Sequence, residues 1–411
     1  MKFSILSALL LILSLSITQA QEKTRLTINF SDQIEQWITL EKAMQSARPD
    51  TIYYLNLSNQ SLKRIPKNIY KFENLKVLNL ANNDLRRLPS KLNRFDSLAQ
   101  VNISGNGSAD KNKRISALQA ANFEVMKQFN GMWTPEIRVK SDSITALITA
   151  LMNQPVKRTL RFGNCRNIRR LNYSNSYLTT VHPSIRRLTG LQEINLSRNS
   201  LEALPMQITG LSSLTKLNLA SNKLTRLPAE TGKLQNLIAL ILYKNKLTAV
   251  PEPIYELKNL YELDLAYNEI PELLSRIHNL QRLEVLFLSF NKLRFLPEEV
   301  GTLPHLEGLY VHHNRLSFLP ESISRLQGLK TLHINNNDFS YFPTQIVSLK
   351  NLQDLDISHN YIEEFNPKLA EMPHLKMLFL NNNAINKNSP EYMPYKEIFN
   401  SLRAREVIVT D

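Results

Sequence analysis

The chain has 411 residues, with 50 Lys and Arg, 36 Asp and Glu, and one cysteine. A single cysteine excludes an intramolecular disulfide, so packing must stabilise the fold. The net charge of +14 would suit anionic lipid, acidic glycan or nucleic acid, of which nucleic acid is disfavoured because no aromatic stacking platform accompanies the basic residues.

The first twenty residues have the pattern of a secretory signal peptide. An apolar stretch at 3–17 precedes the small residues Thr18 and Ala20, which suit cleavage before Gln21. The stretch is short for a membrane span, and no later run is long enough for one. Residues 1–20 therefore predict a secreted, periplasmic or cell-surface protein, and an uncleaved N-terminal anchor is the alternative.

Residues 21–51 are predicted to form an N-terminal helical cap. A short amphipathic helix is indicated by apolar residues at Trp37, Ile38, Leu40, Ala43 and Met44. Arg48 and Pro49 would end it.

From Ile52 onward a leucine-rich unit recurs at a constant spacing, which indicates a solenoid. The first block covers 52–106. A second block, the main array, covers 168–383, and its nine successive units open at Ile168, Leu191, Leu214, Leu237, Leu260, Leu283, Leu306, Leu329 and Leu352.

Each unit follows the pattern LxxLxLxxNxLxxLPxxIxxL. The LxL step has the period of two that is typical of a strand, so successive units should stack into one parallel sheet. The proline fixes φ and lacks an N–H donor, which suits an outer turn. Leu274 replaces it in one unit, where the turn should still form. The recurring asparagine, as at Asn291, should bond the backbone of neighbouring coils.

The ladder is lost over residues 107–167, where helices are predicted near 115–129 and 143–152. The step from Leu98 to Ile168 is 70 residues, close to three periods of 23, so degenerate coils and a helical insertion both remain open. Leu160, Phe162 and Cys165 mimic the LxLxxN step with cysteine in place of asparagine, and a buried, structural cysteine is favoured over a reactive one.

Residues 384–411 are predicted to form the C-terminal cap. A helix is expected at 391–402 and a final strand at 407–409. Such flanks are needed because a solenoid exposes apolar core at both ends.

These units resemble the leucine-rich repeat family, in its short 23-residue LxxLP class that includes bacterial secreted repeat proteins. The match covers Ile52 to Asn106 and Ile168 to Asn383. The resemblance implies an α/β fold, a right-handed, horseshoe-shaped solenoid with a parallel sheet on its concave face, where such proteins usually bind partners. The family has no shared catalytic residues, so the resemblance implies neither an enzyme nor a cofactor.

Charge is unevenly distributed between the two halves. Residues 52–236 carry 28 basic and 10 acidic side chains, whereas residues 237–383 carry 13 basic and 17 acidic ones. The densest basic stretch lies within 157–170. The basic half could bind an anionic surface or glycan, although a solvated face is the simpler interpretation.

The residue between the two strand leucines, expected to be exposed, changes character along the array. It is Asn in the first six strands and becomes varied and often aromatic from Ile241 onward. Neighbouring strands lie about 4.8 Å apart, so these side chains should form one patch. The predicted ligand-binding patch consists of Ile241, Tyr243, Tyr267, Phe287, Phe290, Tyr310, His312, His313 and His333.

Catalysis and metal binding are disfavoured. Histidines and aspartates near the patch, such as His333 and Asp354, could be imagined as a metal site or an acid/base pair, but no metal-binding or nucleophile motif accompanies them. We therefore expect an exported, non-enzymatic recognition protein without cofactors that binds a partner protein. A carbohydrate or anionic envelope glycan is one alternative ligand, and a self-associating scaffold is another role.

Overall fold

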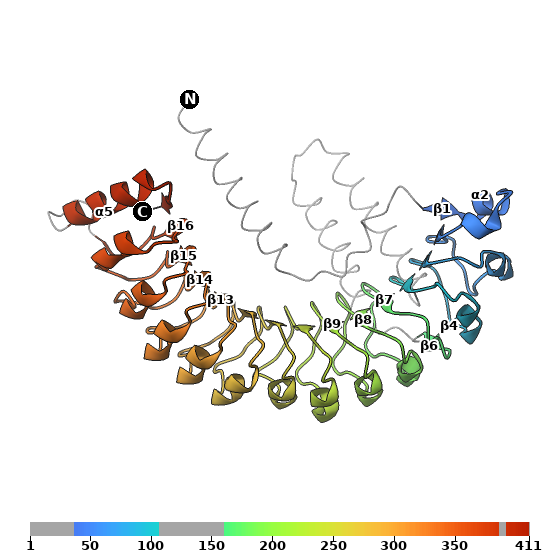
Figure 1. Ribbon diagram of the computed structural model, residues 1–411. Coiled ribbons are helices and arrows are strands. Elements are labelled where there is room, and N and C mark those ends of the chain that lie inside the picture. Colours follow the sequence, from blue (N-terminus) through green and yellow to red (C-terminus); the bar gives the residue numbers. More distant parts are fainter. Residues whose placement is uncertain (1–36, 107–159, 386–391, 411) are drawn as a thin grey trace, which may run out of the picture. The chain divides into compact units, whose positions relative to one another are not determined.

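The computed structural model describes residues 37–106, 160–385 and 392–410 (Figure 1). The predicted signal peptide and the helices predicted within 107–159 lie outside these residues. The described part forms one parallel sheet of 15 strands, which confirms the predicted solenoid class. The strands are β1 (Ile38–Thr39), β2 (Tyr54–Asn56), β3 (Val77–Asn79), β5 (Gln100–Asn102), β7 (Arg170–Asn172), β8 (Glu193–Asn195), β9 (Lys216–Asn218), β10 (Ala239–Ile241), β11 (Glu262–Asp264), β12 (Val285–Phe287), β13 (Gly308–Tyr310), β14 (Thr331–His333), β15 (Asp354–Asp356), β16 (Met377–Phe379) and β17 (Ile408–Thr410).

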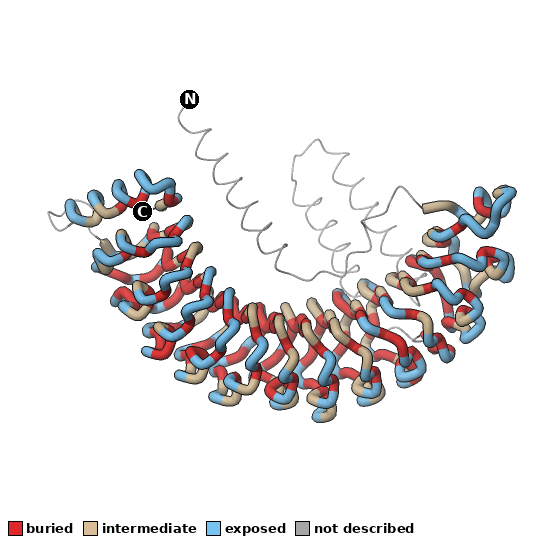
Figure 2. Tube along the Cα trace, in the orientation of Figure 1, coloured by how far each residue is buried: buried red, intermediate tan, exposed pale blue. Residues whose placement is uncertain are grey.

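The core consists of the repeated leucines. Strands pair without a register shift, so Leu263, Leu286 and Leu309 are direct neighbours, and all three are fully buried. Figure 2 shows buried chain along the inside of the coils and exposed chain at their outer turns. Each coil thus buries its apolar side chains against the coils on either side of it, as stacked repeats do.

The side of each coil opposite the sheet is a single 3₁₀ turn (Figure 1). Most of these turns begin directly after the repeat proline. Where Leu274 replaces the proline, the turn still forms, at Ser275–Asn279. The 3₁₀ turns of the coils are Lys67–Lys71, Ser90–Arg94, Pro183–Arg187, Met206–Gly210, Ala229–Lys233, Glu252–Glu256, Ser275–Asn279, Glu298–Thr302, Glu321–Arg325, Thr344–Ser348 and Pro367–Glu371.

The recurring asparagines form a hydrogen-bonded ladder between coils. Asn291 Nδ2 donates to the carbonyl oxygens of Leu265 and Leu288, each at 3.0 Å. Its Oδ1 accepts from the Ile270 N–H at 3.0 Å. One amide therefore serves backbone groups in two successive coils, which agrees with the structural role expected for this residue.

The sheet is continuous across the break in the leucine pattern. β5 pairs directly with β7, with Asn102 opposite Asn172. A second, two-stranded sheet joins the same coils on their flank, where β4 (Arg87–Leu88) pairs with β6 (Arg161–Phe162). The chain therefore leaves the 15-stranded sheet after β5, pairs with the flank strand β4 through β6, and rejoins the sheet at β7.

This pairing corrects the interpretation of the Leu160 to Cys165 segment. Phe162 is paired with Leu88 on the flank, so Cys165 does not occupy the asparagine position. Its thiol is fully buried and donates to the Pro89 carbonyl oxygen at 3.3 Å. Burial raises the pKa of the Cys165 thiol to about 11, which fits the structural cysteine expected from the sequence.

Both ends of the sheet carry short helices. The helix expected from Trp37 onward is shorter than predicted, because β1 adds Ile38 to the sheet and α2 covers only Leu40–Met44. At the other end, α5 (Met393–Ala404) leads into β17, which pairs with β16.

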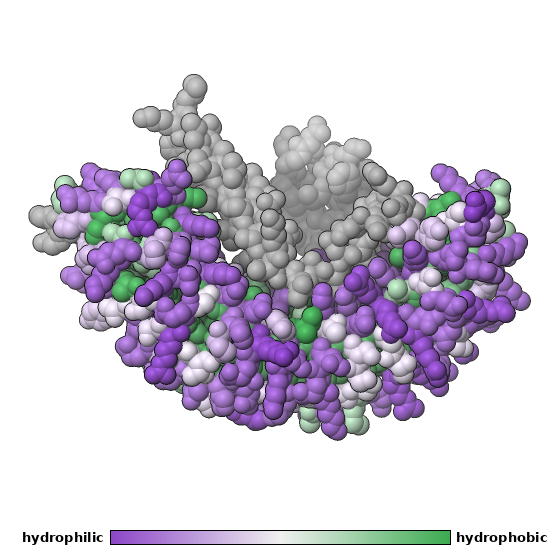
Figure 3. Space-filling view, in the orientation of Figure 1, coloured by the Kyte–Doolittle hydropathy of each residue, from purple (hydrophilic) through white to green (hydrophobic). Residues whose placement is uncertain are grey.

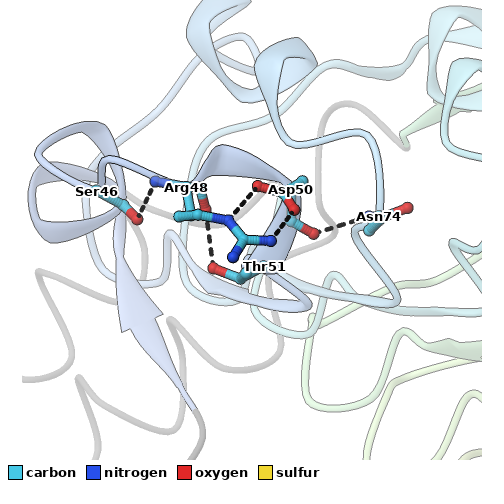
Figure 4. A network of polar contacts seen from close by, with 5 residues as sticks. All are labelled: Ser46, Arg48, Asp50, Thr51 and Asn74. Atoms are coloured by element: carbon cyan, nitrogen blue, oxygen red, sulfur yellow. Dashed lines mark hydrogen bonds and ion pairs between the residues drawn. The ribbon is translucent and has the colours of Figure 1, made fainter.

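A polar network follows α2 (Figure 4). Arg48 pairs with Asp50 at 2.9 Å, and Asn74 Nδ2 donates to the Asp50 carbonyl oxygen at 2.8 Å. The second bond joins this segment to the first full coil. The hydrogen bond from Arg48 lowers the pKa of the Asp50 carboxyl.

The surface of the described coils that faces the viewer in Figure 3 is mainly hydrophilic, with scattered apolar residues. A helix of sufficient length and apolarity to span a bilayer is not found in the described part of the chain.

Candidate functional site

The last residue of each strand lies on the face of the sheet away from the core, and in eight strands it has a structural task. There it is Asn or Asp, and its Oδ1 accepts from the backbone N–H two residues later at 2.9 to 3.1 Å. Such a bond stabilises the turn that follows the strand. The eight residues are Asn56, Asn79, Asn102, Asn172, Asn195, Asn218, Asp264 and Asp356.

Three consecutive strands, β12 to β14, replace this residue with a ring. We call Phe287, Tyr310 and His333 the strand-end row. The Phe287 and Tyr310 rings stack with centroids 4.6 Å apart, and the His333 ring meets Tyr310 edge-on at 5.0 Å. These coils have exchanged a local backbone hydrogen bond for aromatic contacts between coils.

A second aromatic row lies just beyond the strand ends. Tyr267, Phe290 and His313, here called the turn row, each directly precede a ladder asparagine and have φ of 57°, 54° and 53°. Phe290 stacks on both neighbours with centroid distances of 3.9 Å, and Tyr243 meets Tyr267 edge-on at 5.0 Å.

The backbone at the turn row is left-handed, which suits asparagine better than a large ring. Asparagine does occupy this position in five other coils, at Asn59, Asn82, Asn175, Asn336 and Asn382. Bulkier residues there cost about 1 to 3 kcal/mol each. Other coils also have this left-handed backbone with residues such as Arg198 and Lys244, so it is the run of three successive rings that sets these coils apart and points to a function.

The nine predicted patch residues are contiguous but unequally exposed. Full exposure was expected, and this was wrong for Ile241, Phe287, Tyr310 and His333, which are buried. The pairing brings residues at equal positions into direct contact, so each side chain covers part of the next. Tyr267 is 40% exposed and His313 is exposed, whereas Tyr243, Phe290 and His312 are half-buried. The turn row is thus the accessible part of the patch.

Histidines at one end of the patch are in unlike environments. Burial opposes protonation of His333, but the hydrogen bond from its Nε2 to Asp354 Oδ2 at 3.1 Å and the charge of Asp356 outweigh it, so the His333 pKa is raised. Burial lowers the pKa of His312 to about 3, and the charges of His333 and His313 act in the same direction. No group of three His, Cys, Asp or Glu in the described part of the chain is placed to hold a metal ion.

His312 predicts acid sensitivity. Because its pKa is lowered on folding, the unfolded chain binds more protons between about pH 3 and the ordinary value of 6.5. The free energy of unfolding should therefore fall as pH falls through this window. We expect His312→Gln to flatten this dependence in urea titrations at pH 4 and pH 7. An unchanged slope in the variant would contradict the assignment.

The basic stretch of the sequence is divided among different sides of the coils. Arg161 is on the flank in β6, whereas Arg170 in β7 pairs with Glu193 at 3.2 Å. Lys216 lies 3.8 Å from the same carboxylate. The sheet face of this half is therefore partly neutralised, and the arginines do not form a single anion-binding surface.

Sequence reasoning missed two features of the site, namely the strand-end hydrogen bond and the left-handed turn row. A signal for the second was present, because the residue before the ladder asparagine is itself Asn in several coils and aromatic in only a few.

Comparison with known proteins relates this chain to leucine-rich repeat proteins. A family model described as "Leucine-rich repeat region" matches residues 138–295 and 274–403. No curated relative matches. Among solved structures, a leucine-rich repeat protein of Leptospira interrogans is 25% identical with a TM-score of 0.52, covering 90% of this chain and 98% of that chain.

Two further structures share the fold at lower identity. An internalin of Listeria monocytogenes is 19% identical with a TM-score of 0.57, covering 85% of this chain and 84% of that one. Toll of Drosophila, solved in complex with Spatzle, is 19% identical with a TM-score of 0.54, covering 82% of this chain and 48% of that one.

Proposed function

Because this chain belongs to the leucine-rich repeat family, we propose that it is a non-enzymatic recognition protein that binds a partner protein through the aromatic rows of its sheet face. The observation that carries the proposal is the turn row. Three rings occupy a left-handed position that five other coils fill with asparagine, and Tyr267 remains 40% exposed there. Exposed, clustered aromatic side chains are typical of the central contacts of protein interfaces.

The ring stacking favours protein over carbohydrate. A sugar would need free ring faces, but both faces of Phe290 are covered by Tyr267 and His313 at 3.9 Å. The ring edges remain for side chains of a partner. The structure of Toll in complex with Spatzle supports protein recognition by this fold.

We further propose that the protein acts after export, because residues 1–20 have the composition of a cleaved signal peptide. N-terminal sequencing of the mature protein should begin at Gln21.

The binding test replaces the turn row with the residue that the fold prefers. In the triple variant Tyr267→Asn, Phe290→Asn, His313→Asn, relief of backbone strain and loss of about 0.5 to 1.5 kcal/mol per stacked pair should largely cancel. The free energy of unfolding should change by no more than about 1 kcal/mol, whereas affinity for the partner should fall at least about 100-fold.

The partner is first identified by capture on the unmodified protein and then titrated, as a purified protein, by calorimetry. The matched control carries Arg198→Asn, Ser221→Asn and Lys244→Asn, which change the same position in three other coils. This control should keep full affinity. Equal affinity of the turn-row variant and the unmodified protein would rule out the proposed surface.

A further inference from the structure

A row of exposed rings lies on the flank of the coils, away from the sheet face. Phe295, Phe318 and Tyr341 are 43%, 56% and 82% exposed. They recur at the repeat spacing, one per coil, and we call them the flank stripe. Single exposed apolar residues are common on protein surfaces, but three at one repeated position in successive coils form an aligned row.

This position is not aromatic elsewhere in the array. Each ring stands directly before a buried core residue, as Phe318 does before Leu319. In the other coils the equivalent residues are Arg64, Arg87, Thr180, Ala203, Arg226, Ala249, Glu272 and Glu364. The repeat therefore does not demand a ring here, and packing of the coil does not explain one.

Opposite charges border the stripe on its two edges. In the coil of Phe318, exposed Arg315 comes before the ring, nearer the sheet, and exposed Glu321 comes after it, in the outer turn. The coil of Phe295 has Glu298 at the place of Glu321, but Lys292, at the place of Arg315, pairs with Glu269 at 2.7 Å, and Arg294 stands directly before the ring. The coil of Tyr341 departs from it, because Asp338 and Thr344 take these places.

The basic edge is available for a partner. Neither Arg294 nor Arg315 forms an ion pair with another residue in the described ranges. On the acidic edge, Glu321 accepts one hydrogen bond from Gln345 at 2.8 Å, which leaves its charge uncompensated.

We propose that the flank stripe is a self-association surface whose partner is a second copy of this chain, related by a two-fold axis that runs along the stripe. The two-fold rotation lays each ring on its own counterpart and exchanges the two edges. Arg315 then faces the partner's Glu321. A two-fold contact uses one patch twice, so the patch must complement itself, and the coil of Phe318 does so.

The alternative orientations and occupants fit less well. A two-fold axis across the stripe would place the basic edge against itself. An anionic membrane would attract Arg294 and Arg315 but repel Glu298 and Glu321. Three rings bury about 150 to 250 Å² each, less than the roughly 800 Å² per partner of a standard interface, so the dimer should be weak.

The test measures mass as a function of concentration. Sedimentation of the full chain from about 1 to 200 μM should show a monomer–dimer equilibrium with a dissociation constant in the micromolar range. The double variant Phe318→Ser, Tyr341→Ser should weaken association at least tenfold. Met206→Ser is the matched control, because this apolar side chain is 55% exposed but lies in the Met206–Gly210 turn, outside the three coils of the stripe. A monomer at all concentrations, or association that survives the double variant, would overturn the proposal.

A charge exchange tests the direction of the axis. Glu321→Arg should weaken the dimer, because it places two cations opposite each other, and Arg315→Glu added to it should restore association to within about threefold of the original. Failure of the restoration would overturn the proposed axis. All these changes are on the surface, so thermal unfolding should be nearly unchanged. Binding of a partner at the turn row should also be retained, which separates this proposal from the preceding one.

Discussion

Asn291→Ala should lower the free energy of unfolding by about 3 kcal/mol, because it leaves several backbone groups in two coils without partners. The side chain donates to Leu265 and Leu288 and accepts from Ile270, and alanine offers no replacement for any of these bonds. Each unsatisfied buried group costs about 1 to 3 kcal/mol, and partial access of water reduces the total.

Urea unfolding measures the loss, and hydrogen exchange at the Ile270 amide locates it. Asn351→Ala is the control, because Asn351 is exposed and also donates to a backbone carbonyl, that of Gln327, at 2.8 Å. It should cost less than about 1 kcal/mol. Equal effects at the two positions would mean that the ladder has no special weight.

The second large effect is expected at Gly163, where two backbone segments approach closely. Its N–H donates to the Leu88 carbonyl oxygen at 2.6 Å, and an added Cβ would come within 2.3 Å of the Ser90 nitrogen. Gly163→Ala must therefore push β6 away from β4. We expect a loss of about 3 kcal/mol, at the upper end of the cost of overpacking.

The measurement is again urea unfolding, supplemented by proteolysis of the native protein near residue 106. Gly210→Ala provides the control, because no atom lies within 4 Å of the added Cβ. That variant should be neutral or slightly stabilising. If Gly163→Ala were as stable as Gly210→Ala, the flank pairing would not hold the coils together.

The fold could be predicted because its signal is periodic. Every coil repeats the same leucines and asparagine, and the constant repeat spacing places Leu263 beside Leu286 without any further information. The Leu160 to Cys165 segment was misplaced because its local pattern equals that of a strand in the 15-stranded sheet, whereas β6 belongs to the two-stranded sheet. Only the pairing of Phe162 with Leu88, far away in sequence, distinguishes the flank from the sheet.

The position of the candidate patch could also be predicted, but its exposure could not. Alternation along a strand shows which side of the sheet Phe287 occupies, whereas its 3% exposure depends on neighbours such as Tyr310 in the next coil. The left-handed backbone at Tyr267 was indicated only indirectly, by the asparagines that several other coils have at this position. The flank stripe was present in the sequence as three rings with the repeat spacing, but nothing in the pattern showed that they would be exposed.

The direct pairing of β5 with β7 makes the stacking of the coils independent of the segment between these two strands. Hydrogen bonds on both sheets fix the chain at Asn102 and at Arg161, so the coils hold both ends of whatever segment lies between these residues. Doubling the length of a loop costs only about 0.6 kcal/mol. We therefore expect that a reporter domain with adjacent termini can replace residues 107–159 while the coils keep their spacing.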